Sequence, residues 1–189
     1  SRAAISFLVI GALLILTGCG SSKAKLRVMN ATPDESQIDV SLAGTSLATG
    51  ISYGTATGYN SVTSGSRDLQ IYPSGVATAY IDKTIDLSSG SSYTAMSINV
   101  LSSATALLLT DNNSTPASNT AGLRIVNASP GLGTVDVYVV SPGANLSSVS
   151  PTISSFAFEG VSDYQSLTAS ASYEVCLLYT SPSPRDRQK

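Results

Sequence analysis

The sequence predicts an all-β fold of tandem immunoglobulin-like β-sandwich domains, the second truncated, after an N-terminal signal helix. Three observations lead to this prediction. Short segments of alternating apolar and polar residues are separated by clusters of Gly, Ser and Pro, which favour strands and tight turns. Charged residues make up only 12% of the chain, too few for the outer faces of a helical bundle. In addition, one block of the sequence occurs twice.

The first copy contains about seven short strands, a number typical of a sandwich or barrel. The segment 67–72, for example, places Leu69 and Ile71 on one face. The other clear segments are residues 26–30, 38–42, 80–87, 92–100 and 104–110. Strand alternation predicts one buried cluster, made of Leu26, Val28, Ile38, Val40, Leu69, Ile71, Ile85, Met96 and Ile98.

The duplication can be followed residue by residue. L-R-V-M-N-A-T-P at residues 26–33 returns as L-R-I-V-N-A-S-P at 123–130, an offset of 97 residues, and I-D-V returns as V-D-V at the same offset. Y-N-S-V at 59–62 resembles Y-Q-S-L at 164–167, an offset of 105 residues. The second copy therefore carries extra residues, which we expect in the 141–151 loop. A period near one hundred residues indicates a domain duplication.

The chain begins with a segment typical of secretion. Residues 3–16 are apolar and follow Arg2; at about 1.5 Å per residue they span about 21 Å, short of the ~30 Å core of a bilayer. A positive charge, a short apolar run and a small-residue cleavage site are typical of a signal peptide. The run ends in Leu16, Thr17, Gly18 and Cys19. An ordinary signal peptide, or a membrane helix with an incidental cysteine, is the alternative.

This ending resembles the lipobox of bacterial lipoproteins. The resemblance implies that Leu16, Thr17 and Gly18 are recognised by the signal peptidase and that Cys19 carries the lipid that anchors the protein. In lipoproteins of double-membraned bacteria, Asp after the cysteine commonly marks retention in the inner membrane. Gly20 stands there instead, so the outer membrane or the cell surface is the favoured location in the cell envelope.

The predicted division of the chain is a signal peptide (1–18), a lipidated cysteine and tether (19–24), a first sandwich domain (25–110), a linker (111–122), a second, incomplete repeat (123–175) and a non-native tail (176–189). The tail, C-L-L-Y-T-S-P-S-P-R-D-R-Q-K, resembles translated library-adapter sequence, so Cys176 is assigned no redox role. We expect an unpacked segment 180–189 and an incomplete second sheet with unpaired strand edges.

The repeated motif resembles a known family. The run L-R-V-x-N-A-[ST]-P, then [IV]-D-V, a Gly/Tyr-rich segment and a later S-Y-T strand is similar to the bacterial envelope family named domain of unknown function 4397, over most of residues 25–175. The resemblance implies an exported, often lipid-anchored and often tandem β-sandwich. It supplies no catalytic residue.

One pair of charged residues recurs in both copies: Arg27 and Asp39 return as Arg124 and Asp136. If the first two strands pair across their turn, each Arg faces its Asp on one sheet surface. We favour a cross-strand ion pair, worth about 0–1 kcal/mol, over a ligand clamp.

Other polar and aromatic residues also have structural interpretations. Asn30 and Asn127 precede a turn proline and are expected to hydrogen-bond the turn backbone. The segment 111–113 is rich in oxygen ligands but lacks the spaced ligand set of a calcium loop, so a solvated linker is favoured over a Ca²⁺ site. Two interpretations are open for the tyrosines: they are ordinary strand residues, or they form a surface that stacks on sugars. They are Tyr53, Tyr59, Tyr72, Tyr80, Tyr93, Tyr138 and Tyr164.

Composition narrows the class of function. His is absent, the net charge of −2 leaves no basic patch for nucleic acid, and the sequence has no nucleophile elbow or phosphate loop. We therefore predict no catalytic residue, no metal and no cofactor, in a non-enzymatic, lipid-anchored module for adhesion or scaffolding. Its expected partners are the membrane, through Cys19, and a surface glycan or an envelope protein. A carbohydrate-binding module is the alternative, and a hydrolase is a distant third.

Overall fold

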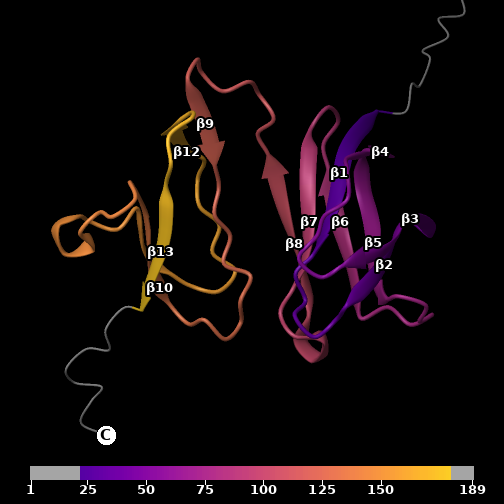
Figure 1. The fold of residues 1–189 in the computed structure, drawn as a ribbon. Coiled ribbons are helices and arrows are strands. Elements are labelled where there is room, and N and C mark those ends of the chain that lie inside the picture. The colour runs from indigo at the N-terminus through magenta and orange to yellow at the C-terminus, as the bar shows by residue number, and fades with distance from the viewer. Residues whose placement is uncertain (1–21, 180–189) are drawn as a thin grey trace, which may run out of the picture.

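The computed structural model describes residues 22–179 and shows two lobes, one for each repeat (Figure 1). The first repeat comprises β1 (Lys23–Asn30), β2 (Gln37–Leu42), β3 (Thr45–Ser52), β4 (Asn60–Thr63), β5 (Gly65–Pro73), β6 (Ile81–Leu87), β7 (Ser92–Ile98) and β8 (Thr105–Asp111). The second comprises β9 (Thr120–Leu123), β10 (Val135–Val140), β11 (Ile153–Phe156), β12 (Gln165–Thr168) and β13 (Glu174–Tyr179). Two 3₁₀ turns, η1 (Leu101–Ser103) and η2 (Leu146–Ser148), follow β7 and β10. Within residues 22–179, no helix has the length and apolar character needed to cross a bilayer.

The first repeat is a sandwich of two four-stranded sheets, ordered β4-β1-β7-β8 and β3-β2-β5-β6. Alternation along β1 turns Ala24, Leu26 and Val28 toward the second sheet and leaves Lys23 and Lys25 outside. β1 lies parallel to β7, and the other pairs in the two sheets are antiparallel. The all-β sandwich predicted from the sequence is confirmed.

The core of this repeat differs from the prediction at one strand. All nine residues predicted to be buried are buried, and seven of them belong to the cluster between the two sheets. Met96 and Ile98 instead form a separate cluster with Leu109, on the outer face of β7 and β8. The prediction of one cluster is wrong for these two residues, because the second repeat covers the outer face of β7 and buries both sides of that strand.

The second repeat reproduces the strand pairing of the first. Leu26 is opposite Asn60 between β1 and β4, and their counterparts Leu123 and Gln165 are opposite each other between β9 and β12. The next sheet repeats in the same way, with Ile38 opposite Ile51 and Val135 opposite Phe156. The predicted duplication is therefore confirmed at the level of register.

The second repeat has fewer strands in the part of the chain that the structure describes. Its sheets are β11-β10-β13 and β12-β9, and strands equivalent to β6, β7 and β8 do not occur among the described residues. Among residues 22–179, the sheets of the second repeat are thus smaller than those of the first. β13 also crosses the boundary expected after Val175, since Cys176 is opposite Tyr138 of β10. The predicted signal helix and the segment 180–189 lie outside the described residues.

Candidate functional site

The two repeats meet at Asp111, the last residue of β8. Alternation places Asp111 on the same face as Leu107 and Leu109, which pack against the second repeat. The Asp111 side chain is only 1% exposed. The interpretation of Asp111 as part of a solvated linker is therefore wrong, because β8 continues through this residue; β9 then begins at Thr120.

Both carboxylate oxygens of Asp111 have partners. Tyr59 and Thr94 donate their hydroxyl protons to Oδ2 at 2.7 and 2.6 Å, and the Arg124 guanidinium donates to Oδ1. Arg27 Nε lies 3.8 Å from Oδ2 and donates to Thr94 Oγ1 at 2.7 Å. A buried carboxylate is tolerated only when it is paired and hydrogen-bonded in this way. Because Arg124 comes from the second repeat, the network joins the two lobes.

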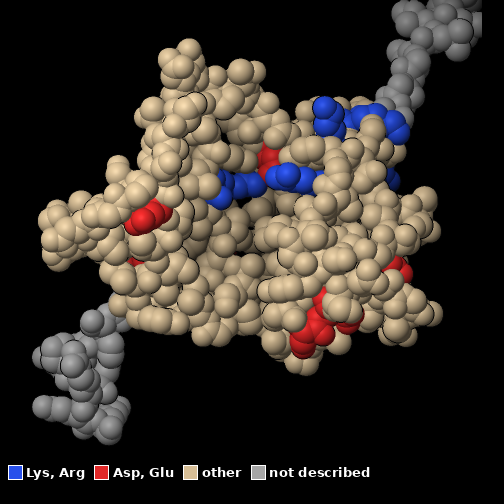
Figure 2. Space-filling model, viewed as in Figure 1, with Lys and Arg blue, Asp and Glu red and all other residues tan. Residues whose placement is uncertain are grey.

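Each arginine of the network also lies over a tyrosine ring. The Arg27 guanidinium is 5.0 Å from the centroid of Tyr59, and that of Arg124 is 4.8 Å from the centroid of Tyr164. These are equivalent residues in the two repeats, and the distances are in the range of cation–π contacts. The recurrence of Arg and Tyr in the sequence therefore reflects one duplicated Arg–Tyr unit. Basic and acidic atoms meet in the hollow between the lobes (Figure 2).

The surroundings of Tyr59 keep its phenol in the donor form. Burial, together with the hydrogen bond to Asp111, raises the pKa of Tyr59 above its ordinary value. The hydroxyl group thus stays protonated over the whole physiological range, and it remains available to Asp111.

The predicted ion pair between Arg27 and Asp39 is not formed. β1 and β2 follow each other in the chain but lie in different sheets, so the two side chains do not face each other. Asp39 instead accepts hydrogen bonds from Gly50 N at 2.7 Å and Gly75 N at 3.1 Å, and these backbone donors lower its pKa. In the second copy, too, the equivalent residues do not pair with each other. Asp136 accepts a hydrogen bond from Ser155 N at 2.8 Å, and Arg124 binds Asp111.

The turn role predicted for the two asparagines is confirmed. Asn30 Oδ1 accepts a hydrogen bond from Thr32 N at 3.1 Å, and Asn127 Oδ1 accepts one from Ser129 N at the same distance. Asn30 Nδ2 also donates to the carbonyl oxygen of Ile51 at 3.2 Å. Both asparagines are buried, so they stabilise the fold rather than offer a binding surface.

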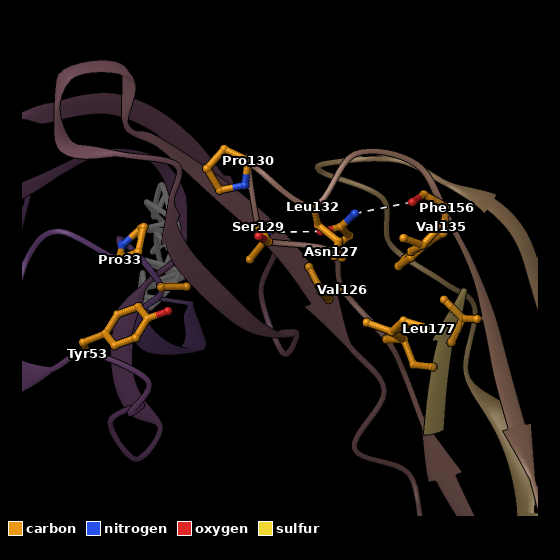
Figure 3. Close-up of a pocket in the computed structure, with 14 residues that line it drawn as sticks. Pro33, Tyr53, Val126, Asn127, Ser129, Pro130, Leu132, Val135, Phe156 and Leu177 are labelled. Carbon is orange, nitrogen blue, oxygen red and sulfur yellow. Dashed lines mark hydrogen bonds between the residues drawn. The ribbon is translucent and has the colours of Figure 1, made fainter. Parts of the chain in front are cut away.

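An apolar pocket of about 310 Å³ also lies between the lobes (Figure 3). Ala31, Pro33 and Tyr53 of the first repeat line one side. The second repeat lines the rest, including Val126, Asn127, Leu132, Val135, Val137, Phe156 and Leu177. Val135 and Val137 are the counterparts of Ile38 and Val40, which are closed over in the first repeat by side chains of β6 and β7. The pocket therefore lies against the small core of the second repeat, in which Val135 and Val137 remain buried.

The predicted tyrosine surface is divided among several environments. Tyr93 and Tyr138 are buried, whereas Tyr59 and Tyr164 lie against arginines. Tyr53, by contrast, is 53% exposed at the rim of the apolar pocket. These tyrosines therefore do not form one stacking surface. Tyr53 is the exposed aromatic side chain at the pocket, whose wall also includes the buried ring of Phe156.

Other predicted sites fall in two groups. Among residues 22–179, no three His, Cys, Asp or Glu side chains gather where they could hold a metal ion. Leu16, Thr17, Gly18 and Cys19 lie outside the described residues.

The sequence interpretation missed the network around Asp111, although apolar alternation continues through T-A-L-L-L-T-D and places Asp111 in phase with two leucines.

The fold and the junction define a class of protein, a tandem β-sandwich whose repeats share a buried carboxylate. The model of the family described as Domain of unknown function (DUF4397) matches residues 24–138, which span the first repeat, β9 and part of β10. The chain belongs to this family. No curated protein is significantly similar to it.

Proposed function

We propose that the protein is a non-enzymatic module of the bacterial cell envelope, anchored by a lipid on Cys19, that holds two repeats in fixed geometry for adhesion or scaffolding. The observation that carries this proposal is the Asp111 network. An eight-residue connection, 112–119, would by itself let the repeats move. A buried carboxylate bound by arginines from both repeats opposes that motion.

Apolar packing supports the same interpretation. Met96, Ile98 and Leu109 of the first repeat are buried against side chains that include Val126 and Phe158 of the second. Separating the repeats would expose this surface to water and leave Asp111 without Arg124, and both changes are unfavourable. A rigid pair of domains suits a protein that spaces or presents other molecules at a surface.

The non-enzymatic part of the proposal rests on chemistry. His is absent from the sequence, so the commonest general base is missing. Asp111 is buried, and its carboxylate is hydrogen-bonded to Tyr59, Thr94 and Arg124, so these partners hold it in a structural role. Turnover of an ester, peptide or glycoside by the purified protein would contradict this part.

The anchor is tested by metabolic labelling with radioactive palmitate in a bacterial host. We expect the wild-type protein to carry label and to fractionate with membranes. Cys19→Ser should lose the label, whereas Cys176→Ser is the matched control and should keep it. Equal labelling of the wild type and Cys19→Ser, or no labelling of any form, would contradict the lipid anchor.

A glycan-binding module is the second candidate, and the exposed ring of Tyr53 beside the apolar pocket favours it. Tyrosine rings at a pocket rim can stack on sugars. Glycan-array binding that is lost in Tyr53→Ala and kept in Tyr72→Ala, a tyrosine away from this pocket, would support it. Absence of binding to every cell-wall and surface glycan on the array would remove this candidate.

A further inference from the structure

The start of the described chain carries a positive charge that the fold does not neutralise. Lys23 and Lys25 project from the outer face of β1, and Arg67 lies at the start of β5. In the part of the chain that the structure describes, the ion pairs within 4.0 Å all involve Asp111, so these three cations form none. Figure 2 shows basic atoms gathered where the described chain begins.

Hydrogen bonds hold two of these cations, Lys23 and Arg67, beside one another. Ser22 accepts a hydrogen bond from Ser64 N at 2.9 Å, which ties the start of the described chain to the turn between β4 and β5. Arg67 donates to the carbonyl oxygens of Thr63 and Ser64 at 3.1 and 2.7 Å, and Lys23 Nζ lies 3.4 Å from Thr63 Oγ1. Lys23 and Arg67 consequently line one groove of about 440 Å³.

The opposite end of the first repeat carries the opposite charge. Asp34 and Glu35 lie in the turn after β1, and that strand runs from Lys23 to Asn30. At about 3.3 Å per residue, this strand separates the two ends by about 23 Å. Asp68, next to Arg67 in β5, and Asp86, opposite Ser66, are the strand carboxylates nearest to Arg67 in register, and these two charges reduce but do not cancel the charge of three cations. The repeat is therefore polarised along β1.

The short chain between Cys19 and Lys23 limits how far the basic end can lie from a lipid on Cys19. Lys23 follows Cys19 by four residues, which span at most about 14 Å in any conformation. The headgroup layer on each side of a bilayer is about 5–7 Å thick, and electrostatic attraction extends about 8 Å further at physiological salt. A lipid on Cys19 would therefore hold Lys23 within the electrostatic range of the headgroups.

We propose that the end of the first repeat formed by Lys23, Lys25 and Arg67 docks on anionic phospholipid headgroups. The proposal rests on the lipid anchor at Cys19 put forward above. Charge then orients the sandwich, with its basic end on the membrane and Asp34 and Glu35 directed away from it. Each basic residue near such a surface strengthens binding about fivefold.

The test uses the mature chain from residue 19 with Cys19→Ser, since every residue of the sandwich core follows residue 22. Sedimentation with phosphatidylglycerol-containing vesicles at low ionic strength is compared with phosphatidylcholine vesicles. We expect binding only to the former, reversal by salt, and binding weakened about 30-fold in Lys23→Gln/Lys25→Gln. Lys83→Gln is the control, since it removes the same charge per substitution. Lys83 lies elsewhere on the sandwich, where it donates to the Ala106 carbonyl oxygen.

Two results would overturn the proposal: equal binding of the double variant and the wild type, or equal binding to both kinds of vesicle. Competition by millimolar inorganic phosphate at constant ionic strength would also overturn it, since it would indicate a site for a soluble anion. The vesicle experiment uses a chain without the lipid-bearing cysteine. Its outcome is therefore independent of palmitate labelling, and failure of the anchor is distinguishable from failure of the docking surface.

Discussion

The strands β5 and β13 occupy the same place in the two repeats and differ in burial. Ile71 is opposite Val40 in the first repeat, and Leu177 is opposite the equivalent Val137 in the second. Ile71 is fully buried, whereas Leu177 is 48% exposed. The neighbouring pair differs equally, with Leu69 fully buried and its counterpart Val175 54% exposed.

The difference separates two contributions to the sandwich. The register of the first five strands is the same in both repeats, so it depends on contacts within that segment. Burial of β5 depends in addition on β6, β7 and β8, whose equivalents do not occur among the described residues of the second repeat. Apolar residues in equivalent positions therefore contribute unequal hydrophobic stabilisation.

The largest effect is expected where the two repeats are joined. Asp111→Ala removes one partner of a buried ion network and should lower the free energy of unfolding by about 3–5 kcal/mol. Urea unfolding measures this change, and X-ray scattering should show a larger radius of gyration as the lobes separate. Asp86→Ala, at an exposed carboxylate, is the control and should change stability by less than about 0.5 kcal/mol. An Asp111→Ala effect no greater than the control would show that the repeats are not coupled here.

Truncation of equivalent core residues tests the comparison directly. Leu69→Ala should cost about 2–5 kcal/mol of unfolding free energy, because it opens a cavity in a closed core. Val175→Ala should cost less than about 0.5 kcal/mol, because its side chain is half exposed. Urea denaturation of both variants gives the two values. Similar losses would mean that Val175 is as deeply packed in solution as Leu69.

One backbone position should respond in opposite directions in the two repeats. Gly50 and Ser155 are equivalent, and both have positive φ, +64° and +52°. Left-handed backbone favours glycine, so Gly50→Ser should destabilise by about 1 kcal/mol and Ser155→Gly should stabilise by about 0.5–1 kcal/mol. Thermal unfolding followed by circular dichroism measures both shifts. A stability loss in Ser155→Gly would contradict the equivalence of the two turns.

The smallest effect concerns pH. Backbone N–H donors from Gly50 and Gly75 lower the pKa of Asp39, so its folded-state pKa lies below its unfolded value. Its contribution to stability is complete above the unfolded pKa, about 3.9, and is lost as pH falls through the folded value. Asp39→Asn should therefore reduce the urea midpoint at pH 7, and the difference from wild type should vanish in acid. A difference that persists unchanged below both pKa values would contradict this cause.

Sequence patterns predicted strands, faces and duplication because each of these is a local or periodic property. Alternation identified Leu26 and Ile71 as core residues without any knowledge of their neighbours. The contact partners of a side chain, by contrast, depend on which distant segments of the chain come together. Arg27 was assigned to Asp39 on the assumption that consecutive strands form a hairpin. The chain instead crosses to the other sheet after β1, and Arg27 lies beside Thr94 of β7 and near Asp111 at the end of β8. The same crossing explains why the site around Asp111 could not be predicted.

The parallel pairing of β1 with β7 affects when the first repeat can fold during its synthesis. Arg27 is opposite Thr94, 67 residues further along the chain. At a synthesis rate of about 5–20 residues per second, β1 waits about 3–13 s after its own emergence before its central neighbour exists. Pairings between segments so distant in sequence also form slowly. The first repeat therefore cannot complete its sheet until β7 and β8 have been synthesised, whereas the β2–β3 hairpin can form as soon as its strands exist.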